Sequence, residues 1–311
     1  MGNFNRFGNM FPPDEVMKRS YLLAEEPFRI YGNLYFVGNT WCSSHLIDTG
    51  EGLILLDTCC LNDIAYLINN IWKLGFQLSD LKWIVVSHAH PDHYGAVRGL
   101  VHLTGAKTFI SKIDGEEFRL SRSRLEKMNY NHGPDRCPDE LFEPDVLLED
   151  GEVIQLGNTR MRCVLTPGHT IGTMSHFWEA YDKTERKKVG IYGGAGFRPL
   201  GKDRMKSDGT PESYRQVFEQ SIDKVWKEEV DINLGNHPFH NDTFEKHERR
   251  KEKGGNPFID PTEWQRFLQA LKDAYHAFIK LEENEIQAML AQSEFLDYRD
   301  MARPYLDEKN R

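Results

Sequence analysis

The sequence lacks several features that would each place it in a recognisable class of protein. No run approaches the roughly eighteen consecutive apolar residues that a membrane span needs. Neither GxGxxG nor GxxxxGK(S/T) occurs, which argues against dinucleotide and P-loop nucleotide chemistry. The five cysteines are an odd number without a CxxC pair, so the sequence predicts inert buried thiols, and neither a disulfide framework nor a thiolate metal site. These cysteines are Cys42, Cys59, Cys60, Cys137 and Cys163.

An excess of positive charge is also missing. The formal net charge is −9, which repels nucleic acid, so no nucleic-acid partner is expected. The basic run Lys246 to Lys253 is interrupted by glutamates at helical spacing, which favours a solvated helix face. The stretch Met1 to Ser20 lacks the apolar core of a secretory signal. We therefore expect a cytoplasmic protein with no membrane partner.

What is present is the composition of a globular chain. Its 311 residues are 39% apolar and 28% charged, and by length alone they allow about two domains. No linker rich in Gly, Ser or Pro divides them, which favours one layered domain. Strands are predicted at 29–37, 45–48, 53–57, 82–87 and 107–111, with helices at 63–74 and 93–103. A second set of strands is predicted at 152–156, 159–165, 173–178, 188–192 and 231–234, with a helix at 211–227.

Two further segments stand apart in composition. The stretch from about Lys112 to Asp145 is irregular and rich in arginine, as lids and binding loops often are. The tail from Asp260 onward predicts an amphipathic helix with Asp260 as N-cap, Pro261 at the first helical position and Glu263 completing a capping pattern. Its apolar stripe should pack on the body or on a second subunit, so a homodimer through this helix is possible. The stripe consists of Trp264, Phe267, Leu268, Leu271, Tyr275, Phe278 and Leu281.

The chemistry is concentrated where the predicted strand 82–87 runs into a loop. The segment from Ser87 to His93 reads SHAHPDH and holds four metal-competent side chains in six residues. On an extended strand end, His88 and His90 point the same way and can reach one ion. Pro91 turns the chain, so that Asp92 and His93 face a second position. Imidazole and carboxylate donors without thiolate suit zinc, with iron, manganese or cobalt as alternatives.

Two downstream histidines follow strands and can complete these sets. His169 lies in TPGHT after the strand 159–165, and His237 lies in LGNHP after the strand 231–234. The predicted ligands are therefore His88, His90 and His169 for one ion, and Asp92, His93 and His237 for the other. With two ions about 3.5–4 Å apart, a bridging water becomes a nucleophile near neutral pH. Asp92 would orient it and take up its proton, as the catalytic residue.

The pattern HxHxDH, followed by TPGHTxGT and a late GNHP, resembles the metallo-β-lactamase superfamily over roughly Pro27 to Pro257. The resemblance is greatest to the lactamase subclass whose second metal is held by Asp, His and His. It implies an α/β fold, a four-layered αββα sandwich, with two Zn²⁺ at one edge of the sheets and no organic cofactor. The chain is then a single domain, 1–311, with a core at about 27–257, an insertion or lid at about 112–145 and a helical tail at about 260–311.

One departure from the resembling hydrolases concerns the second metal. Glyoxalase II and the lactonases of this superfamily carry a bridging aspartate after the strand equivalent to 188–192. This chain reads YGGAGF from Tyr192 to Phe197, which offers no carboxylate, thiol or hydroxyl at the corresponding glycines. The sequence thus argues against a glyoxalase II or lactonase site. It also removes a hydroxyl that lactamases of the resembling subclass tend to use, which argues against penicillin hydrolysis as the physiological role.

Other residues receive weaker assignments. Asp57 is expected to hydrogen-bond a metal ligand or the ligand loop. His132 and His240 are candidates for lining the pocket, whereas the other five histidines are expected in core or surface positions: His45, His102, His176, His247 and His276. Three arginines of the insertion either hold an anionic substrate group or form a solvated face: Arg119, Arg122 and Arg124. Four aromatic residues are candidate apolar walls: Trp41, Tyr94, Tyr130 and Phe197.

The sequence thus predicts a zinc-dependent hydrolase that uses a metal-bridging hydroxide to cleave an amide, lactam or ester bond of a small molecule. Two alternatives stay open. One is a phosphodiester or sulfate-ester hydrolase of the same fold. The other is a metal-bound binding protein without catalysis. A di-iron redox role is disfavoured because that branch has glutamate where this chain has His90.

Overall fold

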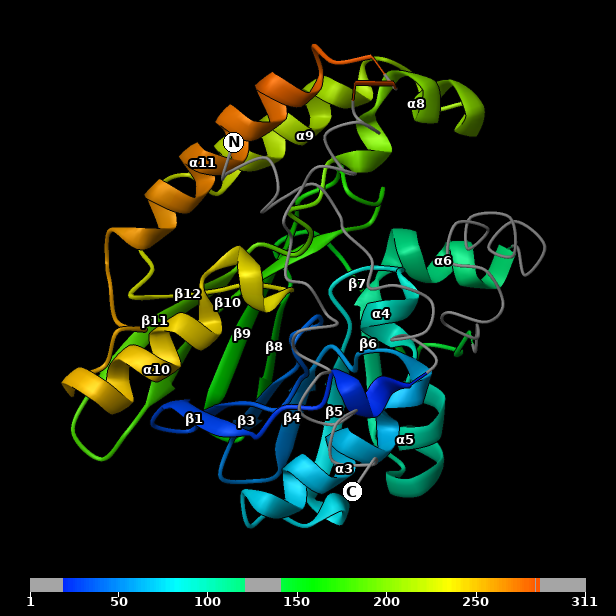
Figure 1. Cartoon of the computed structure of the whole chain (residues 1–311). Coiled ribbons are helices and arrows are strands. Elements are labelled where there is room, and N and C mark those ends of the chain that lie inside the picture. Colours follow the sequence, from blue (N-terminus) through cyan, green and yellow to red (C-terminus); the bar gives the residue numbers. More distant parts are fainter. Residues whose placement is uncertain (1–18, 121–140, 283, 286–311) are drawn as a thin grey trace, which may run out of the picture.

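The apolar segments of the chain assemble into two β-sheets that face each other, with helices on both outer sides (Figure 1). The computed structural model describes residues 19–120, 141–282 and 284–285. The first sheet has the order β1-β2-β3-β4-β5-β6-β7, and the second has the order β12-β11-β10-β9-β8. Helices α3 and α5 cover the first sheet, while α9 and α11 cover the second (Figure 1). The predicted αββα sandwich is confirmed.

The strands are short, as their spacing of turn residues predicts. In the first sheet they are β1 Phe28–Tyr31, β2 Leu34–Phe36, β3 His45–Asp48, β4 Leu53–Leu56, β5 Leu81–Val85, β6 Lys107–Ser111 and β7 Val146–Leu148. In the second sheet they are β8 Val153–Leu156, β9 Thr159–Leu165, β10 Met174–Tyr181, β11 Arg186–Ile191 and β12 Ile232–Leu234. The helices are α3 Ile64–Lys73, α4 Pro91–Tyr94, α5 Val97–Thr104, α6 Lys112–Leu120, α8 Lys202–Asp208, α9 Tyr214–Lys224, α10 Thr243–Lys253 and α11 Glu263–Phe278.

The direction of the strands decides where loops meet. Strands β1 to β4 form an antiparallel meander, and β4 to β7 run parallel. In the second sheet, β8 to β11 are antiparallel and β12 joins β11 in parallel. The carboxyl ends of parallel strands lie at one edge of a sheet, where α/β proteins commonly bind ligands. The two edges are tied together by a hydrogen bond from the Met174 amide to the Ser87 carbonyl, 2.9 Å.

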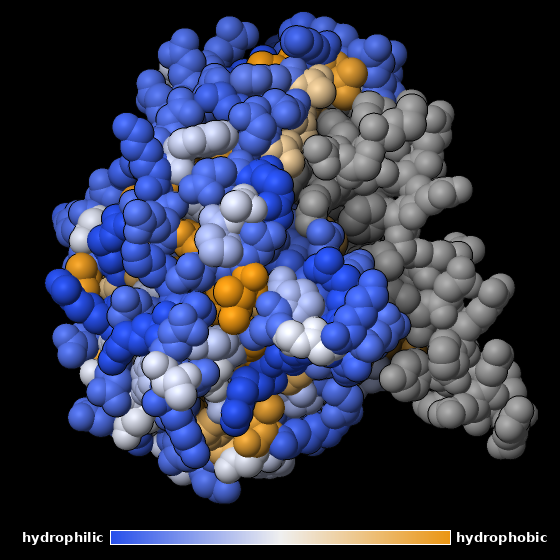
Figure 2. Space-filling model, turned by 90° about the vertical axis from the view of Figure 1, so that its left-hand side faces the viewer, coloured by the Kyte–Doolittle hydropathy of each residue, from blue (hydrophilic) through white to orange (hydrophobic). Residues whose placement is uncertain are grey.

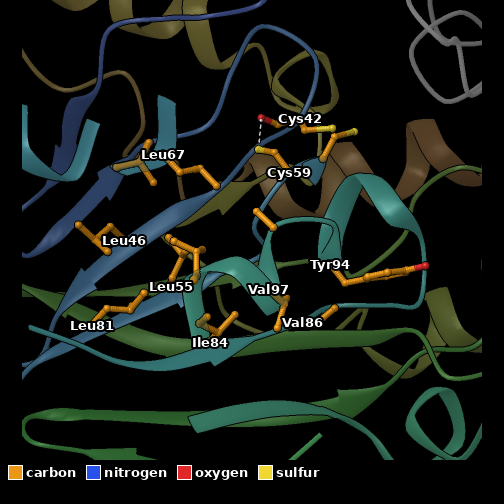
Figure 3. Close-up of a cluster of buried hydrophobic side chains, with 14 of the residues drawn as sticks. Cys42, Leu46, Leu55, Cys59, Leu67, Leu81, Ile84, Val86, Tyr94 and Val97 are labelled. Carbon is orange, nitrogen blue, oxygen red and sulfur yellow. Dashed lines mark hydrogen bonds between the residues drawn. The ribbon is translucent and has the colours of Figure 1, made fainter. Parts of the chain in front are cut away.

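Three hydrophobic clusters hold the layers together. One lies between the sheets and includes Ile47, Ile54, Met161 and Trp178. A second lies under α3 and α5 (Figure 3), and a third lies under α9 and α11. Each large apolar side chain buried in such a cluster contributes about 1.5–3 kcal/mol. Both sheets contribute to the middle cluster, and the single domain stays a prediction.

The sequence misplaced several element boundaries. The strand predicted at 29–37 is a hairpin, because the chain reverses at Gly32, where φ is +48° and a Cβ would lie 2.1 Å from the Tyr181 carbonyl oxygen. The helix predicted at 93–103 is two helices, α4 and α5, which Gly95 and Ala96 separate. Strand β7 and helix α8 were not predicted. The strand β7 has only three residues, which is too short for periodicity to show.

The helical tail begins two residues later than predicted. The N-cap is Thr262, and Asp260 instead accepts hydrogen bonds from the Thr262 amide (3.0 Å) and hydroxyl (2.7 Å). The predicted apolar stripe is buried against the third cluster of the same chain, with Leu281 at its edge. Most of the stripe is therefore already covered, and a homodimer through this helix stays a prediction.

Helix α10 carries the basic run. Most of its charged side chains are exposed, as predicted, and Lys251 pairs with Glu248 one turn away at 2.7 Å. Lys246 is different, because it is only 3% exposed and contacts both carboxylate oxygens of Glu263 at 2.6 Å. The expected solvated face is therefore wrong for Lys246. Glu263 contributes a buried ion pair rather than a helix cap.

The described surface is predominantly polar. Figure 2 shows one face on which hydrophobic residues form small separate patches among hydrophilic ones. Among the helices of the described residues, none is both long enough and apolar enough to cross a bilayer.

Candidate metal centre

All six predicted metal ligands come together at the loop edge of the two sheets. His88 and His90 follow β5, and Asp92 and His93 lie in the short helix α4 that Pro91 begins. His169 lies in the loop after β9, and His237 follows β12. The ring centroid of His88 lies 4.8 Å from that of His90, 4.6 Å from that of His169 and 4.1 Å from that of His93. The centroids of His93 and His237 are 5.3 Å apart.

A first group consists of His88, His90 and His169. One nitrogen from each ring lies within 4.8 Å of the others. His90 Nδ1 and His169 Nε2 are 2.9 Å apart. His88 Nε2 is buried and has no hydrogen-bond partner, which is costly for a polar atom unless a ligand satisfies it. Three imidazole nitrogens that converge in this way form the donor set that zinc prefers, with room for one further ligand.

A second group surrounds the carboxylate of Asp92. Its Oδ2 lies 3.5 Å from His93 Nε2 and 3.6 Å from His237 Nε2. These separations are long for hydrogen bonds, whose donor and acceptor usually lie about 2.7–3.2 Å apart. They are within about 0.1 Å of the roughly 3.3–3.5 Å that separates oxygen and nitrogen ligands of one tetrahedral zinc ion. The residues present at both groups therefore fit zinc.

The outward-facing ring nitrogens are hydrogen-bonded to the protein. His169 Nδ1 lies 2.5 Å from the Gly196 carbonyl oxygen, and His237 Nδ1 lies 2.6 Å from that of Trp41. His93 Nδ1 lies 2.9 Å from Asp57 Oδ2, and the same carboxylate accepts bonds from the Ser87 amide (2.7 Å) and hydroxyl (2.8 Å). Such partners fix the tautomer that leaves Nε2 available for a metal. The hydrogen bond expected of Asp57 is thus present.

Burial keeps most of these imidazoles neutral. It lowers the pKa of His88 well below the usual value, with help from the neighbouring histidines. It also lowers the pKa of His169 and of His237 to about 4. Burial acts in the same direction on His93, but the carboxylates of Asp92 and Asp57 outweigh it and raise its pKa to about 9. Neutral imidazole is the form that binds a metal, so three of these four rings are in that form at neutral pH.

Asp114 braces the first group, and the sequence did not single it out. Its Oδ2 accepts hydrogen bonds from the Ala89 amide (2.8 Å) and from the Thr170 hydroxyl (2.9 Å). One buried carboxylate therefore connects the loop that carries His88 and His90 with the loop that carries His169. Asp114 lies in α6, within the stretch predicted to be an irregular insertion, and only its place after a buried strand could have drawn attention to it.

The glycine segment after β11 is packed against the first group. A Cβ at Gly194 would lie 2.8 Å from both Cβ and Cδ2 of His169, and one at Gly193 would lie 1.8 Å from the Met174 carbonyl oxygen. A side chain at either place requires something to move. The segment therefore lacks a bridging carboxylate and also lacks room for a side chain that could carry one.

The other predicted site residues differ in whether they lie at the site. Trp41 is buried with its ring centroid 5.6 Å from that of His237, so it does border the site. The ring of His240 lies 5.1 Å from that of His237. Tyr94 and Phe197 instead pack inside hydrophobic clusters under the helices. The prediction that they form walls of the pocket is therefore wrong. Several candidates lie outside the residues whose side chains are described: Arg119, Arg122, Arg124, Tyr130, His132 and Cys137.

The histidines without a motif fall in the core or on the surface, as expected. His102 is exposed, and His247 and His276 are half-buried. His45 and His176 are fully buried, and their strand neighbours Ile47 and Met174 on the same face belong to the cluster between the sheets. No hydrogen-bond partner is present for His45 Nε2 or for either ring nitrogen of His176. Burial lowers the pKa of both histidines to about 4.

Nothing in the sequence indicates that one of the cysteines lies beside the predicted metal ligands. The four described ones are free and buried, as predicted. However, the Sγ of Cys42 lies within 4.8 Å of ligand atoms of both Asp92 and His237, so it is part of a group that could hold a metal. The spacing of cysteines along the chain could not reveal this, because the two partners lie 50 and 195 residues away in sequence.

Solved structures resemble this fold along nearly their whole length. The native FEZ-1 metallo-β-lactamase from Legionella gormanii superposes with a TM-score of 0.75 at 29% identity, over 83% of this chain and 97% of that one. A point mutant of it gives 0.73 at 30% identity over the same shares. BJP-1, a subclass B3 metallo-β-lactamase of Bradyrhizobium japonicum, gives 0.73 at 25% identity, over 88% of this chain and 99% of that one.

Sequence comparison covers less of the chain. A probable polyketide biosynthesis zinc-dependent hydrolase of Bacillus subtilis, PksB, is 29% identical over 100 residues, which are 32% of this chain and 36% of that protein. The chain spans between 21% and 39% of the length of the first curated relatives it matches. The sequence profile of the Metallo-beta-lactamase superfamily matches residues 38–184. From this match and the structural likeness together, the chain belongs to the metallo-β-lactamase superfamily.

Proposed function

We propose that this protein is a zinc-dependent hydrolase that cleaves an amide, lactam or ester bond of a small molecule. The observation that carries the proposal is the convergence of five imidazoles and one carboxylate, with three of the rings oriented by hydrogen bonds from their outer nitrogens. A similar hydrolase is described as zinc-dependent, and the similar solved structures are β-lactamases. We assign one zinc ion to each group of ligands.

The chemistry that zinc supplies in such a site is Lewis acidity, which polarises a carbonyl and makes water a stronger acid. In the first group, burial lowers the pKa of His88 and His169 so that both rings are neutral donors, and the three ligands His88, His90 and His169 leave a position for a further one. Among the six proposed ligands, Asp92 is the one carboxylate, so it is the group that can accept a proton from the attacking water. Asp57 keeps His93 oriented through its Nδ1.

Access to the site is set by two side chains. His90 and His237 are partly exposed, whereas His88 and His93 are each 1% exposed. A substrate therefore approaches over His90 and His237, with Trp41 beneath the latter. Gly194 leaves no side chain on the His169 side, so the substrate carbonyl faces imidazoles rather than a competing carboxylate.

The test is a substrate survey with the zinc-loaded protein and with a chelated sample. Esters, lactones, a chromogenic cephalosporin, amides and phosphodiesters are compared. Hydrolysis of a carbonyl substrate that disappears on chelation and returns with zinc is expected. Asp92→Asn should reduce turnover of the same substrate by about 10²–10⁴-fold.

Two outcomes would contradict the proposal. Turnover of phosphodiesters alone would move the protein to that branch of the superfamily. A protein that binds zinc fully and cleaves nothing in the survey would be a binding protein instead. The cytoplasmic location inferred from the sequence is part of the same proposal, and it makes small metabolites the substrates to test first.

A further inference from the structure

Cys42 lies in the second group, although it was expected to be an inert thiol. Its side chain is completely buried, and its Sγ is 3.9 Å from Asp92 Oδ2. The Sγ, a carboxylate oxygen of Asp92 and a ring nitrogen of His237 all lie within 4.8 Å of one another. In Figure 3, Cys42 and Cys59 lie at one end of the hydrophobic cluster, well away from Leu81. Cys42 is therefore at the border between the core and the site.

The loop that carries Cys42 is held firmly in place. Asn39 Oδ1 accepts hydrogen bonds from the amides of Trp41 (2.8 Å) and Cys42 (2.7 Å). The Ser43 amide donates to the Asn236 carbonyl at 2.8 Å, and the Trp41 carbonyl accepts from His237 Nδ1. The same short loop thus orients His237 and presents the thiol beside it. Such rigid positioning is what a metal ligand requires.

The distances around Asp92 Oδ2 fit ligands of a common ion. A sulfur and an oxygen ligand of one tetrahedral zinc ion lie about 3.5 Å apart, given Zn–S of about 2.3 Å and Zn–O of about 2.0–2.2 Å. The observed 3.9 Å requires a shift of only a few tenths of an ångström. His237 Nε2 lies 3.6 Å from the same oxygen and belongs with Cys42 and Asp92 to the group whose ligand atoms are all within 4.8 Å of one another. His93 joins this group through Asp92, because its Nε2 lies 3.5 Å from that oxygen.

Charge balance favours the thiolate. Metal binding requires His93 and His237 in their neutral forms, so among these three ligands only Asp92 would offset a divalent cation, which keeps one positive charge among largely buried side chains. An uncompensated buried charge is costly. A thiolate cancels it, because the thiol loses its proton to solvent as the sulfur–metal bond forms.

We propose that Cys42 is the fourth protein ligand of the second metal position, together with Asp92, His93 and His237. This inference rests on the proposed function. Four protein ligands close a tetrahedral site, whereas catalytic sites keep one position open. The open position therefore belongs to the ion held by His88, His90 and His169. The sulfur also makes the second position selective for thiophilic divalent cations such as Zn²⁺, Co²⁺ and Cd²⁺.

The experiment uses the full-length protein loaded with two equivalents of Co²⁺. A cobalt–thiolate bond gives a charge-transfer band in the near ultraviolet, which nitrogen and oxygen ligands do not give. We expect this band in the wild type and its loss in Cys42→Ser. Cys163→Ser is the matched control, because Cys163 is equally buried but belongs to the cluster between the sheets. That variant should keep the band.

Metal stoichiometry by native mass spectrometry and circular dichroism accompany the spectra. Cys42→Ser should bind the second ion at least about tenfold more weakly while the first ion stays bound. Cys42→Ala serves as a second variant where the serine form does not fold. Two bound cobalt ions without a thiolate band in the wild type, or a band that survives in both Cys42 variants, would overturn the assignment and leave the hydrolase proposal intact. A wild type that binds no cobalt would instead overturn the proposed function.

Discussion

Two of the regions in which this molecule buries charged and polar groups satisfy them in opposite ways. Between α10 and the first residue of α11, the ammonium of Lys246 contacts both carboxylate oxygens of Glu263 at 2.6 Å, so the buried charges satisfy each other. At the loop edge, His88 Nε2 has no hydrogen-bond partner, and Asp92 Oδ2 lies 3.5 and 3.6 Å from the Nε2 atoms of His93 and His237, which is long for a hydrogen bond to either ring.

The difference teaches how to tell a structural polar cluster from a binding one. A buried pair that completes its own contacts serves the fold, and removing one partner is strongly destabilising. A buried cluster that leaves donor atoms directed at a common point is complete only with a ligand. Changes in the first region should therefore alter stability without altering chemistry, and changes in the second should do the reverse.

The largest expected effect is on chemistry, from His90→Ala. This ring is partly exposed, so its loss costs little packing, but it removes one of three donors of the first group. We expect hydrolysis to fall on the order of 10³-fold and one metal ion to be lost per chain. Mass spectrometry and steady-state kinetics measure both. The exposed His102→Ala is the control, and a His90→Ala protein that retains two ions would break the comparison.

Next is the stability effect of Lys246→Met. It leaves the carboxylate of Glu263 buried without its partner, so the free energy of unfolding should fall by about 3–5 kcal/mol in a urea titration. Metal content per folded chain should not change. Lys251→Met on the same helix removes an exposed pair and should cost less than about 1 kcal/mol. Equal losses from the two variants would show that burial does not matter here.

Asp57→Asn tests a residue that is not itself a proposed metal ligand but that holds a proposed ligand in place. Asparagine tolerates the positive φ of +59° at this position, so the variant mainly removes the charge that holds His93 Nδ1. We expect the second metal ion to bind roughly 10–100-fold more weakly, with little change for the first. A competition titration against a chelator measures the two affinities. Asp48→Asn at the end of β3 is the control, and an equal loss at both positions would contradict the assignment.

The smallest effect concerns a buried group with neither a partner nor a ligand. Burial lowers the pKa of His176 to about 4, whereas an unfolded histidine has a pKa of about 6.5. Below about pH 6.5 the unfolded chain takes up a proton that the native ring does not, so stability falls as pH drops towards 4. His176→Leu should reduce the loss between about pH 7 and pH 5 by about 1–2 kcal/mol.

The pH experiment is done by urea unfolding with chelator present, so that metal loss does not contribute. His102→Ala, which removes an exposed histidine, should leave the pH dependence as in the wild type. If His176→Leu leaves the slope of the free energy of unfolding against pH unchanged, the ring is protonated or solvated within the native sandwich. His176 would then not be a buried group without a partner.

How much could be predicted from the sequence follows from the range of the interactions involved. The segment from Ser87 to His93 is local, and strand ends with a following turn fix its geometry, so its four candidate ligands could be read directly. His169 and His237 were found because each follows a strand in a turn. Asp114 and Cys42 reach the site only through tertiary folding. Apart from the place of Asp114 after a buried strand, nothing in their sequence surroundings distinguishes them from ordinary buried residues.

The predicted ends of some strands and helices were wrong for a related reason. The turn at Gly32 has a φ of +48°, and the Tyr181 carbonyl, far away in sequence, leaves no room for a Cβ there. The helix α11 begins at Glu263 rather than at Pro261, and Glu263 is held there by Lys246 of another helix. Periodicity predicts which residues are buried, but it does not reveal which partner is buried with them.

The glycine at position 194 limits the routes by which this site can change. Aspartate, serine and cysteine are each one nucleotide away from two of the four glycine codons. Each would bring a Cβ to 2.8 Å from His169 and would disturb a ligand before it could add one. A second substitution that makes room has to come first or at the same time. The proposed ligand set is therefore separated from that of the enzymes with a bridging aspartate by a substitution that also requires His169 to move.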